Sequence, residues 1–160
     1  MKRKIFCAIL AVVLAFLCTG CRSIPPSVEA VEETFTKNYD NLLTVISFMA
    51  NLEFDEIQIA GSSETMYADF KWVDITEPAV NAAVNELLGT NIYMHIYKRG
   101  NTIRVLQWSS SQNISCGIAY TINGKDLPFV EFMTKIVPLS KEGWYYYVAD
   151  YNEWRRQQRS

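Results

Sequence analysis

Residues 92–122 read IYMHIYKRGNTIRVLQWSSSQNISCGIAYTI, and this stretch decides the fold class. Two segments rich in β-branched and aromatic residues flank the turn signal at residues 99–101, a pattern typical of a β-hairpin. A third segment alternates apolar and polar residues and ends at another turn signal. Segments joined by such short turns pair in antiparallel fashion. The strands that this pattern predicts span residues 92–98, 102–109 and 114–122.

Patterns on both sides of this stretch predict further elements. From Val28 to Ala50, apolar residues recur every three or four positions, as in an amphipathic helix. A second helix follows Thr76, has its apolar stripe at Val80, Ala83, Val84, Leu87 and Leu88, and ends at Gly89. The other predictions are strands over residues 53–60, 66–74 and 143–148, a helix that Asp126 caps and Pro138 ends, and a terminal helix over residues 150–158.

This order of elements predicts an α+β fold. We expect one domain over residues 28–160, built on a mostly antiparallel sheet of about five to six strands with helices packed on it. The chain of 160 residues is 49% hydrophobic and 20% charged, a composition that excludes intrinsic disorder.

The first 21 residues form a pattern of their own. Met1-Lys2-Arg3-Lys4 is positively charged, residues 5–18 are apolar, and Thr19-Gly20-Cys21 follows. This pattern resembles the signal peptide and lipobox of bacterial lipoproteins. The resemblance implies that residues 1–20 are removed, that Cys21 carries the lipid, and that the domain is held on the extracytoplasmic side of a cell membrane. An uncleaved N-terminal anchor is the alternative, and it places the domain on the same side because the cations stay inside.

The tether and the charge of the mature chain bear on its partners. Residues 21–27 hold the cysteine and a short tether with two prolines, which reaches only about 20 Å and keeps the domain close to the membrane. Removing residues 1–20 takes away three cations and no acid, which leaves 12 basic against 17 acidic residues and a net charge of −5. An acidic domain does not bind nucleic acid through electrostatic attraction, so we expect no nucleic-acid partner.

Motifs for catalysis and for cofactor or metal binding do not emerge from the sequence. His95, the single histidine, is predicted to share a strand face with Tyr93 and Tyr97 and lacks the spacing of a metal site. Cys116 lies in an apolar alternation that predicts burial. We therefore predict no catalytic residue, no metal ligand and no cofactor. Two carboxylates could still form a catalytic acid/base pair, and the residues that could supply them are Asp55, Glu56, Glu64, Asp69 and Asp74.

Residues 144–154 read WYYYVADYNEW and carry six aromatic side chains. If the first half is a strand, Trp144 and Tyr146 face one side and Tyr145 and Tyr147 face the other. One set belongs to the core, and the other is either buried under a helix or exposed for recognition. We predict that Tyr145 and Tyr147 are the more solvent-exposed pair and that Trp154, Arg155 and Arg156 extend the same binding surface.

The leading functional hypothesis is a membrane-tethered extracytoplasmic lipoprotein that acts as a non-catalytic binding or interaction module. Its partner would be a protein or a glycan of the cell envelope. One alternative is a small cell-envelope enzyme that uses carboxylates. Another is a structural envelope lipoprotein whose first helix packs against a partner.

Overall fold

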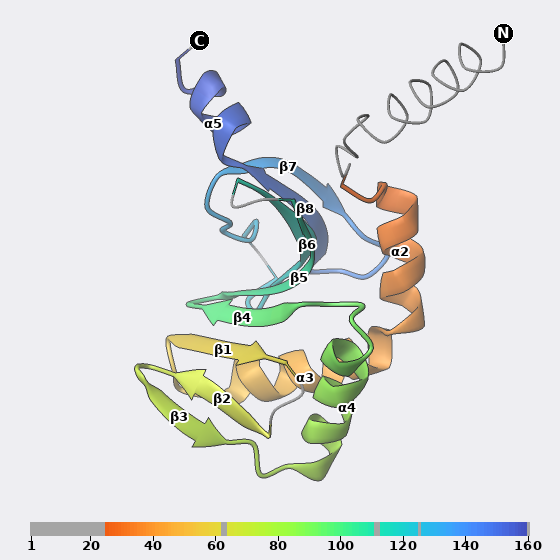
Figure 1. Ribbon diagram of the computed structural model, residues 1–160, viewed down its shortest axis with the longest axis vertical. Helices are drawn as coiled ribbons and strands as arrows, with labels where there is room; N and C mark the ends of the chain where they lie inside the picture. The colour runs from red at the N-terminus through yellow and green to blue at the C-terminus, as the bar shows by residue number, and fades with distance from the viewer. Residues whose placement is uncertain (1–24, 62–63, 111–112, 125, 160) are drawn as a thin grey trace, which may run out of the picture.

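The protein folds as one antiparallel sheet with three helices on one of its faces (Figure 1). The computed structural model describes residues 25–159, apart from residues 62–63, 111–112 and 125. In this part of the chain there are four helices and eight strands, and the strands follow the order β3-β2-β1-β4-β5-β6-β8-β7. The α+β class and the single domain are therefore as predicted, whereas the sheet has eight strands rather than five or six.

The elements follow one another from the first helix to the last. The helices are α2 (Val28–Lys37), α3 (Tyr39–Asn51), α4 (Pro78–Gly89) and α5 (Tyr151–Gln157). The strands are β1 (Glu56–Ala60), β2 (Thr65–Ala68), β3 (Lys71–Asp74), β4 (His95–Arg99), β5 (Thr102–Ser110), β6 (Ile114–Thr121), β7 (Met133–Pro138) and β8 (Trp144–Asp150).

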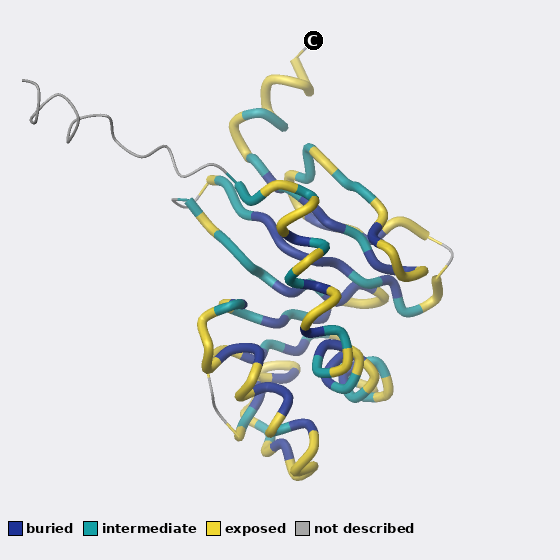
Figure 2. Tube along the Cα trace, turned by 90° about the vertical axis from the view of Figure 1, so that its right-hand side faces the viewer, coloured by how far each residue is buried: buried dark blue, intermediate teal, exposed yellow. Residues whose placement is uncertain are grey.

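The core lies between the sheet and helices α2, α3 and α4 (Figure 2). Phe35 of α2 and Leu42 of α3 are fully buried, as are Ile96 and Ile118 on the central strands. The predicted apolar stripe of α4 is confirmed in full, because all five of its members are buried. Burial of this apolar surface supplies the main force that holds the helices on the sheet.

The first predicted helix is two helices. The chain leaves the helical conformation at Asn38, whose backbone lies at φ −107° and ψ 11°. The Asn38 side chain donates a hydrogen bond to the carbonyl of Thr34, a local bond that competes with the helical ladder. The break lets α2 follow strands β6 and β8 while α3 packs against α4.

The predicted strand over residues 66–74 is a hairpin. Asp69 and Phe70 both have positive φ, at 41° and 69°, and the chain reverses between β2 and β3 at these two residues. Positive φ at both central positions is the conformation of a type I′ turn, which matches the twist of the paired strands. The side chain of Phe70 consequently lies in solvent, 87% exposed, rather than beside Met66 in the core.

The helix predicted between Asp126 and Pro138 is wrong. Residues 133–138 form β7, an edge strand that pairs with β8. Thr134, Ile136 and Val137 are β-branched and favour a strand, and Pro138 is tolerated because an edge strand has one unpaired side. A spacing of three and four between apolar residues thus occurred by chance in an edge strand and the loop before it.

The predicted lipid attachment at Cys21 and the signal peptide lie outside the described residues. Within the described part, none of the four helices is both long and apolar enough to cross a membrane.

Candidate functional site

The face of the sheet opposite the helices carries a row of polar and aromatic side chains. Residues that lie directly opposite one another on neighbouring antiparallel strands project on the same face. The strand register places seven residues in one such row from β3 to β8, in the order Trp72, Tyr67, Gln58, Tyr97, Arg104, Ala119 and Tyr145. We call the part of this row from Trp72 to Arg104, with His95 and Leu106 beside it, the open-face site.

The open-face site is hollowed. One hollow, of about 370 Å³, is lined by Gln58, Ala60, Thr65, Tyr67 and Trp72. A neighbouring hollow, of about 240 Å³, is lined by Gln58, His95, Tyr97, Arg104, Leu106, Ser115 and Tyr147. Because Gln58 lines both hollows, they adjoin one another and run across the strands. An elongated ligand that crosses the sheet would fill both.

Two aromatic side chains form the wall of the first hollow. The rings of Tyr67 and Trp72 meet edge to face, with 5.3 Å between their centroids. Trp72 is nevertheless 72% exposed, so most of its indole surface is available to a ligand. Aromatic rings in such positions offer a flat apolar surface, and tyrosine adds a hydroxyl.

Two polar groups in the second hollow, on Arg104 and His95, lack a carboxylate or hydrogen-bond partner among the described residues. The guanidinium of Arg104 lies over the ring of Tyr97, at 5.0 Å from the centroid, and forms no ion pair with any described residue. The Nδ1 atom of His95 is shielded from solvent and has no hydrogen-bond partner in the described structure. Buried polar atoms are normally hydrogen-bonded, so an atom without a partner is a candidate for ligand binding. Tyr93, which was predicted to share this face with His95, is buried on the helix side instead, because β4 begins only at His95.

The loop between β6 and β7 covers the continuation of this face over β6 and β8. Val130 of this loop and Met133 at the start of β7 pack on Ala119, Tyr147 and Ala149 in a small second core. Tyr147 is therefore only 3% exposed. The prediction that Tyr147 belongs, with Tyr145, to the more solvent-exposed pair is wrong. Burial raises the pKa of its phenol to about 12. Tyr145 is half-buried and lies at the end of the cross-strand row.

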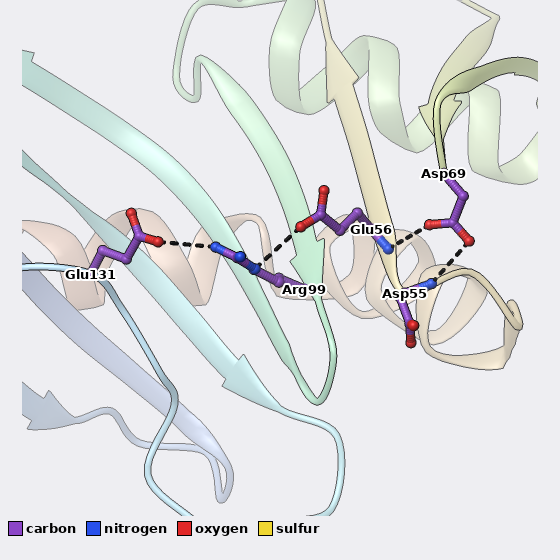
Figure 3. A network of polar contacts seen from close by, with 5 residues as sticks. All are labelled: Asp55, Glu56, Asp69, Arg99 and Glu131. Atoms are coloured by element: carbon purple, nitrogen blue, oxygen red, sulfur yellow. Dashed lines mark hydrogen bonds and ion pairs between the residues drawn. The ribbon is translucent and has the colours of Figure 1, made fainter.

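Charged side chains hold this loop to the sheet (Figure 3). Arg99 at the end of β4 binds Glu131 of the loop at 2.9 Å and Glu56 of β1 at 3.2 Å. Asp69 accepts hydrogen bonds from the backbone amides of Asp55 and Glu56. Three carboxylates of this region, those of Glu56, Asp69 and Glu131, thus have structural partners.

The other predicted binding residues lie apart from the open-face site. Trp154 is half-buried and lines a hollow of about 630 Å³ together with residues 127–133, while Arg155 and Arg156 are exposed on α5. We call Leu127, Phe129, Phe132, Tyr151 and Trp154 the C-terminal patch. A smaller hollow of about 260 Å³, to which Arg104 and Phe132 both contribute, lies between this patch and the open-face site.

Sequence reasoning missed Gln58, Tyr67, Trp72 and Arg104. The signal that could have found Gln58, Tyr67 and Arg104 is the polar half of each strand's alternation, in which they stand, whereas the short strand around Trp72 gives no such signal. Their assembly into one row depends on the strand order, which the sequence does not contain.

Two features of the described residues, their potential metal ligands and the Cys116 thiol, are relevant to catalysis. No group of three or more histidine, cysteine, aspartate or glutamate side chains lies close enough to hold a metal ion in the described part. Cys116 is buried as predicted, and burial raises the pKa of its thiol to about 11. The thiol is consequently protonated at neutral pH and unsuited to nucleophilic attack.

Comparisons of the chain with models of protein families, with curated proteins and with solved structures give no match.

Proposed function

We propose that this protein is a lipid-anchored, extracytoplasmic binding module that holds an acidic oligosaccharide of the cell envelope on its open-face site and performs no catalysis. The observation that carries the proposal is the row of cross-strand neighbours Trp72, Tyr67, Gln58, Tyr97 and Arg104 along adjoining hollows.

The chemistry of this row fits a sugar chain. A sugar ring has an apolar C–H face and a rim of hydroxyl groups, so it packs on an aromatic ring while its hydroxyls bind polar side chains. Trp72, Tyr67 and Tyr97 supply the rings, and Gln58 and His95 supply hydrogen-bonding groups. The row extends over several strands, as a linear chain of sugars requires.

Arg104 favours an acidic ligand over a neutral one. Its guanidinium has no carboxylate partner among the described residues and points over Tyr97 in a partly enclosed hollow. Guanidinium groups bind carboxylates through paired hydrogen bonds, and a hydrogen bond to a charged group contributes about 1.5–3 kcal/mol. A carboxylate or phosphate on the ligand would give Arg104 the anionic partner that the described residues do not provide.

Calorimetric titration of the purified full chain tests this proposal. Hyaluronan hexasaccharide, which carries carboxylates, is the acidic probe, and chitohexaose is its neutral counterpart. We expect the acidic probe to bind more tightly, and Arg104→Gln to weaken it about ten-fold or more. Trp72→Ala should weaken both probes, because a ring contact does not depend on ligand charge.

Two matched variants control for general effects of substitution. Arg155→Gln removes an exposed arginine and Phe129→Ala removes an aromatic side chain that is 67% exposed, and both lie outside the open-face site. These variants should bind as the unmodified chain does. If Arg104→Gln and Trp72→Ala also bind both probes normally, the open-face site is not the sugar-binding surface.

The proposed anchor has a separate test. Cys21→Ala should abolish metabolic labelling by a fatty-acid analogue, because the lipobox-like pattern ends at this cysteine. The variant should accumulate as an uncleaved precursor or as a shed product. Unchanged labelling in cells that produce the variant would show that Cys21 is not the acylated residue.

The carboxylate enzyme is the weaker reading. Glu56 and Asp69, which line a hollow of about 90 Å³, are engaged by Arg99 and by backbone amides. The pKa of the Glu29 carboxyl group is lowered, chiefly by a backbone hydrogen bond. A general acid needs a raised pKa instead.

A further inference from the structure

The C-terminal patch exposes several large apolar side chains around one hollow. Leu127 is 62% exposed, and Phe129, Phe132 and Tyr151 are exposed beside it, around a hollow to which Trp154 contributes. Contiguous apolar surface of this kind marks a place where a protein meets a partner or a membrane.

The aromatic residues of the patch form one fixed cluster. The Phe132 ring meets the ring of Tyr151 at 4.9 Å and that of Trp154 at 5.2 Å, both edge to face. Phe132 has φ +57°, which turns the loop so that its side chain lies under α5. Tryptophan and tyrosine are the residues that favour the interface between a bilayer and water.

Positive charge adjoins this apolar cluster. Helix α5 carries Arg155 and Arg156, and Arg159 follows it. Glu153 pairs with Arg156, whereas Arg155 and Arg159 form no ion pair with any described residue. Next to the patch, Glu131 is paired with Arg99, whereas Asp126 accepts a hydrogen bond from the neutral amide of Asn123 and keeps its negative charge. Residues 151–159 nevertheless hold three arginines against one acid, Glu153, which gives this segment a net charge of +2 on a chain whose part after residue 20 has a net charge of −5.

The anchored end of the domain is the end that carries α5. The hydroxyl of Tyr146 on β8 donates a hydrogen bond of 2.9 Å to the carbonyl of Pro26. Helix α5 continues directly from β8, and the start of α2 and α5 lie at the same end of the molecule, far from the hairpin of β2 and β3 (Figure 1). Only three residues separate Cys21 from Pro25, so a lipid on Cys21 keeps this end next to the bilayer.

We propose that the C-terminal patch lies on the surface of a bilayer that contains anionic lipid, with Trp154 at the level of the headgroups and Arg155 and Arg159 beside lipid phosphates. This inference rests on the proposed attachment of the chain to a membrane. Apolar residues flanked by arginines bind such surfaces, and local positive charge draws them to anionic lipid. The acidic remainder of the chain is repelled by the same surface, so the two effects together orient the domain. The hairpin of β2 and β3, which carries Trp72, then points away from the membrane.

Tryptophan quenching tests this contact. The full chain is reconstituted in vesicles whose acyl chains carry bromine, with or without phosphatidylglycerol in a phosphatidylcholine background. We expect bromolipid to quench fluorescence more strongly in vesicles that contain phosphatidylglycerol, and Trp154→Phe to remove this quenching. Trp72→Phe is the matched control, because Trp72 is exposed at the opposite end of the molecule and should not contribute.

Three outcomes would overturn the proposal. Quenching that persists in Trp154→Phe would show that Trp154 is not at the bilayer. Equal quenching with and without phosphatidylglycerol, or no effect of exchanging Arg155 and Arg159 for glutamate, would exclude attraction to anionic lipid. The same measurement on the purified, uncleaved full-length chain of Cys21→Ala separates this proposal from the lipid anchor, since this form keeps apolar residues 5–18 to hold it in the vesicle. Quenching through Trp154 in a variant that is not acylated supports the contact whatever the labelling experiment shows.

Discussion

At the scale of single residues, Gly117 is the position where the fold tolerates no side chain. It lies on β6 opposite Leu106, next to an irregularity of the β5–β6 pairing between Leu106 and Trp108. A Cβ atom on Gly117 would lie 2.0 Å from the carbonyl oxygen of Val105, and this neighbour is backbone that has no rotamer to change. Bulges of this kind bend a strand, and the glycine allows the neighbouring backbone to come close.

Gly117→Ala should therefore be strongly destabilising, by several kcal/mol, because the two central strands must separate to admit the methyl group. Gly100→Ala is the matched control. Gly100 also resists substitution, through its φ of +53°, but no atom lies within 4 Å of the added Cβ, so a cost of about 1 kcal/mol is expected. Urea unfolding followed by circular dichroism measures both. Equal losses in the two variants would contradict the steric argument.

At the scale of elements, β8 shows how one strand serves two faces. Trp144 and Tyr146 point toward the helices, where the Trp144 ring lies 5.0 Å from Phe35 and from Tyr120. Tyr145 and Tyr147 point the other way, toward the open face and its covering loop. The first four residues of β8 are aromatic, and both faces of the strand are partly or fully covered.

The two faces of β8 should differ in what truncation costs. Trp144→Ala should lower the free energy of unfolding by about 3–5 kcal/mol, since it removes a large aromatic side chain that is 2% exposed. Tyr145→Ala should cost less than about 2 kcal/mol, because its side chain is only half-buried. Thermal melting of the two variants measures the difference. If both lose the same stability, Tyr145 belongs to a core and not to the edge of a binding surface.

The elements also show which parts of the structure are readable from sequence. The alternation of β4, β5 and β6 and the apolar stripe of α4 were predictable because each depends on local periodicity. The turn at Asp69 and Phe70 was not, because phenylalanine rarely occupies positive φ and gives no turn signal. Strand β7 was missed because its apolar residues, together with those of the preceding loop, also fit a helical spacing. The open-face site was out of reach because its residues lie far apart in the chain and meet only through the strand order.

At the scale of the whole molecule, the surface of the sheet is covered in three different ways. Helices cover one face, a loop held by Arg99 and Glu131 covers part of the other, and the remaining strands stay open. The open-face site and the C-terminal patch then lie at different parts of the domain, with the smaller hollow beside Arg104 between them. This separation is compatible with both proposals, because the proposed membrane contact at one end would leave the exposed strands accessible to the proposed ligand.

The buried titratable groups predict that the whole fold weakens in alkali. Burial raises the pKa of the Cys116 thiol from 9 to about 11 and that of the Tyr147 phenol from 10 to about 12. The unfolded chain therefore loses these protons first, so the stability that they confer is complete below pH 9 and is lost as the pH rises toward 11 and 12. Each group lowers the free energy of unfolding by up to about 1.4 kcal/mol per pH unit in its window.

Lys98 acts in the opposite direction. Its pKa is lowered by burial, against the attraction of Asp55 and Asp69, so its contribution to stability rises with pH below 10.5. Urea unfolding between pH 8 and 11 should show a net decline above pH 10, because the thiol and the buried phenols together then oppose one lysine. Between pH 9 and 10 the free energy of unfolding should respond more favourably to rising pH in Cys116→Ala than in the unmodified chain, since the thiol opposes Lys98 in this window and the buried phenols lose protons at higher pH. The same pH dependence in both proteins between pH 9 and 10 would show that the thiol does not couple to unfolding.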